Sequence, residues 1–123
     1  MRMARLGELE RAIMQVLWSA PGPVTARDVV EALPDRELAA TTVLTVLARL
    51  EAKGLVVRDR DGRAHRYAPT ASHSDHVAAL MREALDSAED RAAALARFVG
   101  SVSPTEAEAL AEALDEARHR RGR

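Results

Sequence analysis

Apolar residues recur at helical spacing in three segments of the first half of the chain. The first, residues 7–19, carries apolar side chains three and four positions apart and is followed by Pro21-Gly22-Pro23, which ends a helix. The second begins at Thr25, where a threonine with an acidic residue three positions later has the layout of a capping box. The third, residues 41–53, is followed by Gly54, which suits a left-handed helix end. The pattern therefore predicts three helices.

The apolar pattern changes after the third helix. Leu55-Val56-Val57 indicates the start of a strand, and Asp61-Gly62 is a strong signal for a two-residue hairpin turn. The return strand would then cover Arg63 to Ala68, which places Arg60 opposite Arg63, and Val24 is a candidate for a short third strand. Three helices followed by a hairpin are the element order of a winged helix-turn-helix, so we expect such a domain at residues 1–70.

The remaining residues, 71–123, are again typical of helix. Ser72 precedes a long apolar stripe, a second segment surrounds residues 90–99, and the capping signals of Ser103-Pro104-Thr105-Glu106 predict a last helix. In that last helix we expect the buried side chains to be Ala107, Leu110, Ala111 and Leu114. The expected fold class is α+β, mostly α: a winged helix-turn-helix domain followed by a helical region.

The helical region is too short for a core of its own, because about 45 residues of helix are marginal alone. We therefore expect residues 71–123 to be a dimerisation region that pairs with a second copy around a two-fold axis. The alternative is that these helices fold back on the N-terminal domain of the same chain. The residues expected at the interface are the large apolar ones of this region: Val77, Leu80, Met81, Leu85, Leu95, Phe98, Leu110 and Leu114.

The third predicted helix has an unusual outward face. No carboxylate occurs from Ala39 to Leu50, although the chain is 30% charged. Threonine is a poor helix former, so several on one face need another reason. A DNA major groove supplies one, because short hydroxyl side chains permit close approach and an arginine can bond guanine. The alternative is that Thr41 caps the helix and the rest pack on a neighbour. The predicted DNA-contacting residues are Thr41, Thr42, Thr45 and Arg49, with Ala48 on the same face.

The predicted hairpin adds positive charge near this helix. The net charge of the chain is −1, but residues 38–70 hold six Lys/Arg against three Asp/Glu. Like charges on facing strands repel each other, and a polyanion would relieve that repulsion. A plain solvated hairpin is the alternative reading. The arginines expected to contact DNA from the hairpin are Arg58, Arg60, Arg63 and Arg66.

Composition narrows the remaining function classes. The chain has no cysteine, which excludes disulfides and suits a reducing cytoplasm. No signal peptide or membrane span is recognisable, so we expect a cytoplasmic protein without membrane insertion. His73 and His76, with Asp75 beside them, are a weak metal motif without a third placed ligand, and we expect neither metal nor cofactor. Nucleophile elbows and glycine-rich phosphate loops are absent from the sequence, so we do not expect an enzyme.

Several segments are similar to those of one known family. The chain resembles the penicillinase repressors, the BlaI/MecI/CopY family, and most of all their actinobacterial BlaI-type members. The likeness covers nearly the whole chain, and its most specific parts are the third helix and the hairpin together. It is carried by Leu6 to Glu10, Val16-Leu17-Trp18, Thr41 to Leu50, Lys53 to Val56, and Ala64 to Pro69.

The resemblance implies a homodimeric repressor of β-lactamase or related resistance genes that binds a palindromic operator. Family contacts to DNA correspond to Thr41, Thr42, Thr45 and Arg49, although better-known members have lysine where this chain has Thr41. The resemblance also implies a membrane sensor protease of the BlaR/MecR type, which cuts family members at an Asn–Phe bond. The matching bond here is Arg97–Phe98, so cleavage there is a hypothesis. The sensing mode of copper-responsive members needs cysteines, which this chain lacks.

A winged helix that serves only as a protein–protein adaptor, without binding DNA, is the alternative function. Salt dependence separates the two, because binding through several phosphates weakens steeply as salt rises.

Overall fold

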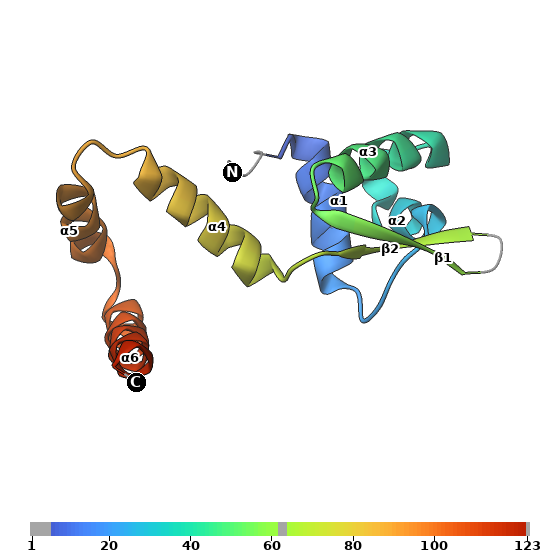
Figure 1. The fold of residues 1–123 in the computed structure, drawn as a ribbon. Helices are drawn as coiled ribbons and strands as arrows, with labels where there is room; N and C mark the ends of the chain where they lie inside the picture. Colours follow the sequence, from blue (N-terminus) through green and yellow to red (C-terminus); the bar gives the residue numbers. More distant parts are fainter. Residues whose placement is uncertain (1–5, 62–63, 123) are drawn as a thin grey trace. The chain divides into compact units, whose positions relative to one another are not determined.

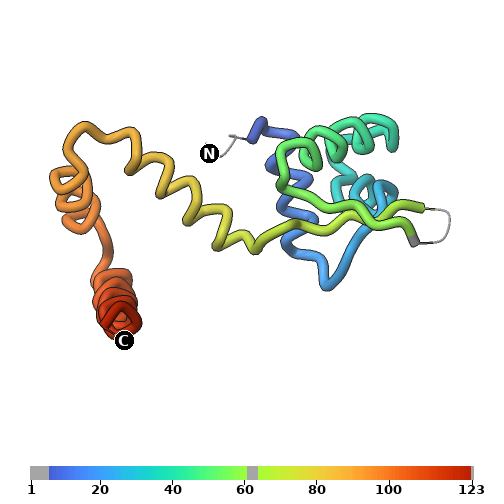
Figure 2. The backbone as a smooth tube through the Cα atoms, viewed as in Figure 1, coloured from blue at the N-terminus to red at the C-terminus, as the bar shows by residue number. Residues whose placement is uncertain are grey.

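The computed structural model describes residues 6–61 and 64–122. The chain divides into two compact units, Met1–Leu80 and Met81–Arg123. The first contains three helices, a two-stranded hairpin and the beginning of a further helix, and the second contains the end of that helix and the two helices that follow it (Figure 1). Figure 2 traces the backbone through each unit.

The three predicted helices of the first unit are present. They are α1 (Glu8–Ser19), α2 (Ala26–Ala32) and α3 (Ala40–Ala52), with a short 3-10 turn, η1 (Pro34–Arg36), between the last two. The capping box at Thr25 is confirmed. The Thr25 hydroxyl accepts a hydrogen bond from the Asp28 N–H at 3.1 Å, and the Asp28 carboxylate accepts one from the Thr25 N–H at 2.9 Å. Gly54 has a φ of +80°, the left-handed conformation predicted for it.

The start of α3 corrects one alternative from the sequence. The N-cap is Ala39, which offers no side-chain hydrogen bond, and Thr41 lies inside the first turn. Thr41 therefore does not cap the helix.

The hairpin is formed by β1 (Val56–Asp61) and β2 (Ala64–Pro69), which pair antiparallel. The register pairs Arg60 with His65, so the predicted pairing of Arg60 with Arg63 is wrong. The register is anchored at the end of the hairpin remote from the turn. There Val24 pairs with Tyr67 through hydrogen bonds of 2.9 and 2.7 Å, which confirms the predicted third strand as a single bridge.

Burial explains why that anchor outweighs the turn signal. Val56 and Tyr67 are 2% and 4% exposed, and a register slip would move core side chains away from their places. Gly62 and Arg63 lie outside the described residues. Gly62 belongs to the predicted turn, and Arg63 is one of the predicted DNA contacts.

The core of the first unit joins all its elements. One side of α3 is buried against α1, α2 and the hairpin, while the other side stays exposed. The fold thus holds α3 rigidly by its apolar stripe and leaves its opposite face available. The most buried side chains are Ile13, Met14, Leu17, Val29, Val43, Leu47, Leu50 and Val56.

Trp18 connects α1 to the beginning of α4 (His73–Asp86). Its indole N–H donates to the carbonyl of Ala71 at 3.2 Å, and its ring stacks on His73 with centroids 4.5 Å apart. His76 is 7% exposed and lies 5.2 Å from the same ring. Burial lowers the pKa of His76, and the neighbouring His73 and Arg11 lower it further.

The second unit contains the end of α4, followed by α5 (Arg91–Ser101) and α6 (Pro104–Arg121). Asp90 caps α5, and Ser103 with Glu106 forms the predicted capping box of α6. The predicted burial along α6 is wrong for the single chain. Leu114 is 55% exposed, Ala107 and Ala111 are exposed, and Leu110 is only partly buried. The physical reason is that too few side chains of the same chain cover this helix.

None of the helices in the part of the chain that the structure describes is both long enough and apolar enough to span a membrane.

Candidate nucleic-acid interface

The outward face of α3 is the candidate site. Thr41, Thr42, Thr45 and Arg49 are all exposed, as the sequence predicted for a face that meets a ligand, and Ala48 is exposed beside them. Each residue turns the helix by about 100°, so these side chains occupy the arc opposite the buried stripe of Val43, Val46, Leu47 and Leu50. The structure thus brings the four predicted α3 residues together on one surface.

Leu44 belongs to the same face and was missed by the sequence reasoning. It is 42% exposed, in contrast to its neighbour Val43, which is fully buried. The signal was available, because Leu44 lies three residues after Thr41 and four before Ala48, which is the spacing of one helix face. An apolar residue next to a core stripe is readily assigned to the core, and this ambiguity hid it.

Hydrogen bonding restricts what Thr45 can offer to a ligand. Its hydroxyl donates to the backbone carbonyl of Thr41 at 3.0 Å. The hydroxyl proton is therefore used within the helix, and the side chain presents a methyl group and oxygen lone pairs.

An ion pair ties the end of α3 to α1. Lys53 Nζ donates to both carboxylate oxygens of Glu10, at 2.7 and 2.9 Å. The Lys53 ammonium lowers the pKa of the Glu10 carboxyl, and the backbone N–H of Gly7 and the charge of Arg49 lower it further. Arg49 therefore extends from a helix whose C-terminal end is linked to α1 by this ion pair.

The three described arginines of the hairpin do not form one cluster. Side chains alternate between the faces of a strand, so Arg58 and Arg60 share the face of buried Tyr67, while Arg66 lies opposite Asp59 on the other face. Arg58 Nε also lies 3.9 Å from a carboxylate oxygen of Glu51 on α3. The fourth predicted arginine of the hairpin, Arg63, is outside the described residues.

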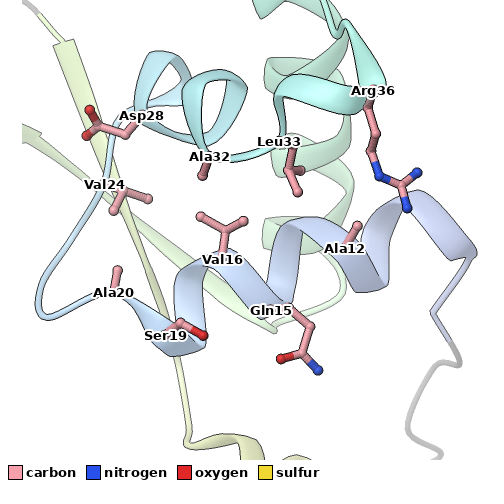
Figure 3. Close-up of a pocket in the computed structure, with 10 residues that line it drawn as sticks. All are labelled: Ala12, Gln15, Val16, Ser19, Ala20, Val24, Asp28, Ala32, Leu33 and Arg36. Carbon is pink, nitrogen blue, oxygen red and sulfur yellow. The ribbon is translucent and has the colours of Figure 1, made fainter.

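An open groove of about 570 Å³ lies between α1 and α2 (Figure 3). Val16 and Leu33 line its apolar part, and charged side chains lie at its ends. Both of these charged groups already have partners: Arg36 donates to the Glu8 carboxylate, and Asp28 belongs to the Thr25 capping box. The two charged groups of this groove therefore serve the fold.

The predicted histidine pair does not gain a third metal ligand. Within residues 6–61 and 64–122, no group of three or more His, Asp or Glu side chains is arranged to hold a metal ion. His73 and His76 instead contact the ring of Trp18.

Three helices, a hairpin and a third helix whose exposed face has no carboxylate from Ala40 to Leu50 define the class: a winged-helix transcriptional regulator. The family model described as penicillinase repressor matches residues 6–116. The chain is also 54% identical over 119 residues to the transcriptional regulator BlaI of Mycobacterium tuberculosis, a match that covers 94% of this chain and 86% of the relative. The chain belongs to the penicillinase repressor family, which is a family of transcriptional regulators and not of enzymes.

Solved structures agree with this assignment. The solution structure of the DNA-binding domain of the repressor BlaI is 26% identical, with a TM-score of 0.51, and the match covers 61% of this chain and 93% of that domain. A transcriptional regulator from Thermotoga maritima is 18% identical, with a TM-score of 0.51, over 92% of this chain and 74% of the other. The second likeness shows the fold alone.

Proposed function

We propose that this repressor binds operator DNA by inserting α3 into the major groove. The observation that carries the proposal is the exposed face of α3, which presents threonines and Arg49 and has no carboxylate from Ala40 to Leu50. Glu51, in the last turn, lies 3.9 Å from Arg58 Nε. A carboxylate there would repel phosphates, whereas hydroxyls bond them and arginine bonds guanine in a bidentate manner. The similar domain of BlaI is described as DNA-binding, which supports the same role for this unit.

The hairpin contributes phosphate contacts in this proposal. Arg60 and Arg66 extend from opposite faces of the hairpin, so one binding mode engages them unequally. Arg58 is held near Glu51 and would exchange that weak, exposed pair for a phosphate. Arg63 retains its predicted role.

We further propose that the chain acts as a homodimer through its helical region, residues 71–123. Of the eight large hydrophobic side chains that are exposed in the described residues, six lie on α4, α5 and α6. Leu80, Leu85 and Leu110 are partly buried within the single chain. Two copies related by a two-fold axis would read a palindromic operator. The six exposed side chains are Val77, Met81, Leu95, Phe98, Val99 and Leu114.

The regulated genes and the inducing signal complete the proposal. Family membership supports control of β-lactamase or related resistance genes in the cytoplasm, with release by a membrane sensor protease at Arg97–Phe98. This bond lies within α5, an eleven-residue helix whose Phe98 is 45% exposed. A helix of this length is marginal by itself, so local opening can expose the bond. A repressor that stays intact with membranes from β-lactam-induced cells would contradict this step.

The test of DNA binding uses the full chain and the DNA upstream of its own gene, with scrambled DNA as the reference. We expect specific binding that weakens with salt at a log–log slope of about −0.9 per neutralised phosphate. Arg49→Ala should lose about tenfold or more in discrimination, because one bidentate base contact is worth ~1–3 kcal/mol. Arg120→Ala, which removes an equal charge from an exposed position of α6, is the control and should leave discrimination unchanged.

Two results would contradict the proposal. Weak salt dependence would favour the adaptor function, since apolar interfaces are far less sensitive to salt. If Arg49→Ala and Arg120→Ala reduced the discrimination against scrambled DNA equally, positive charge in general, and not the face of α3, would determine binding.

A further inference from the structure

An apolar strip follows one edge of the exposed face of α3. Leu44 is 42% exposed, and Ala48, one turn later, is exposed as well. Ala48 adjoins both Leu44, four positions earlier, and the methyl group of Thr45, three positions earlier, because residues three and four positions apart are neighbours on a helix surface. We define the apolar strip as Leu44, Thr45 and Ala48.

The strip is not part of the core. The buried residues of α3 are Val43, Val46, Leu47 and Leu50, and Leu44, which adjoins this stripe, is itself 42% exposed. A single exposed leucine needs no explanation on an ordinary surface. Leu44 differs because it lies beside Thr41 at the edge of the face proposed to enter the major groove, where a solvated helix would carry a charged side chain.

The hydrogen bond within α3 makes the strip more apolar than its sequence suggests. The Thr45 hydroxyl donates to the Thr41 carbonyl, so Thr45 cannot donate a second hydrogen bond to a base. Leu44 and Ala48 have no side-chain donor or acceptor. The three side chains therefore cannot read base edges by donating hydrogen bonds.

Among the four bases, thymine presents an apolar group to the major groove, its C5 methyl. We propose that the apolar strip recognises thymine by contact with this methyl, and that Leu44 is the main specificity-determining residue of the strip. Each operator half-site then carries thymine opposite Leu44, beside the base bonded by Arg49. This inference rests on the proposed DNA binding of α3.

The experiment begins with a randomised duplex library, from which the full-length protein selects its preferred site. Each thymine of that site is then replaced singly by uracil, which removes the C5 methyl and retains every hydrogen-bonding group. We expect about fourfold weaker binding at one or two thymines of each half-site, the equivalent of ~0.8 kcal/mol for one buried methyl-sized group. Other thymines should show no change.

Variants then assign the effect to the strip. Leu44→Gln retains a good helix former and should reduce the thymine-to-uracil ratio at the sensitive position to about one. Val57→Gln is the matched control, since Val57 is 52% exposed on β1, and it should preserve the ratio. Thermal unfolding of both variants verifies that they fold.

The outcomes distinguish failure of thymine recognition by the apolar strip from failure of DNA binding by α3. Selection of a site without sensitivity to uracil at any thymine would overturn the role of the strip and leave DNA binding by α3 in place. An unchanged ratio in Leu44→Gln would overturn the assignment to Leu44. Failure to select any site would overturn DNA binding itself.

Discussion

The two units of this chain are built from similar amounts of helix but differ in how they bury it. In the first unit, α3 has four buried apolar residues, and Leu47 and Leu50 are completely inaccessible to solvent. In the second unit, no residue of α5 or α6 is buried, and Phe98, Val99 and Leu114 are 45–55% exposed. The first unit thus has a core of its own, whereas the large apolar side chains of α5 and α6 are exposed in the single chain. Stability of the first should depend on packing, and that of the second on association.

The largest expected effect is a loss of stability when a packed side chain of the first unit is shortened. Leu47→Ala should lower the free energy of unfolding of the first unit by about 3 kcal/mol, because it removes a fully buried side chain and leaves a cavity. Leu95→Ala, at a position 48% exposed, is the matched change in α5 and should act through association. Urea unfolding at several protein concentrations measures both. If Leu95→Ala lowered the free energy of unfolding as much as Leu47→Ala at every protein concentration, α5 would be part of a packed core within the single chain.

The next prediction concerns association of the second unit. Phe98→Asp should raise the dissociation constant of the homodimer at least tenfold, since it places a charge in a proposed apolar interface (~1.4 kcal/mol or more). Analytical ultracentrifugation measures the dimer fraction against concentration.

Val57→Asp provides the control for Phe98→Asp, because Val57 has a similar exposure, 52% against 45%, but lies in the first unit. It should leave the dimer intact. Dissociation caused by Val57→Asp, or a dimer unaffected by Phe98→Asp, would place the interface elsewhere.

The helix caps offer a smaller and more local comparison. Thr25→Ala removes the side-chain cap of α2 and should destabilise the first unit by about 1 kcal/mol. Ser103→Ala removes the equivalent cap of α6. Because α6 has few contacts within the single chain, loss of the Ser103 cap should cause fraying of the helix end. Faster amide hydrogen exchange in the first turn of α6 measures this fraying. Global destabilisation by Ser103→Ala in the monomer would indicate that α6 is part of a packed core.

The smallest expected effect is a pH dependence at the junction of α1 and α4. The pKa of His76 is lowered in the folded chain, so the unfolded chain binds a proton first as the pH falls. The free energy of unfolding should therefore decrease as the pH falls through the ordinary histidine pKa of about 6.5. The decrease should end once the pH lies below the pKa of His76 in the folded chain. His76 faces the ring of Trp18, with His73 and Arg11 as the charged or titratable neighbours.

Variants of two histidines isolate this dependence. His76→Phe keeps a ring against Trp18 and should remove the decrease in thermal stability between pH 7 and pH 5. His119→Gln, at an exposed position of α6, should preserve it. A decrease that persists in His76→Phe would assign the dependence to other groups.

The local features of this protein could be predicted from short stretches of its sequence. The capping boxes at Thr25 and Ser103 and the left-handed Gly54 depend on residues a few positions apart, and all were predicted. Helical periodicity likewise predicted which residues of α3 face outward, apart from Leu44.

Features that depend on residues far apart in the chain were visible only after folding. The hairpin register follows from the pairing of Tyr67 with Val24 and not from the turn sequence. The exposure of Leu44 follows from which part of α3 the other elements cover. The apolar stripe of α6 was correctly recognised, yet it stays exposed, because periodicity predicts an apolar face but does not say what covers it. Burial is a property of the whole packed assembly, and a segment of sequence contains only one side of each contact.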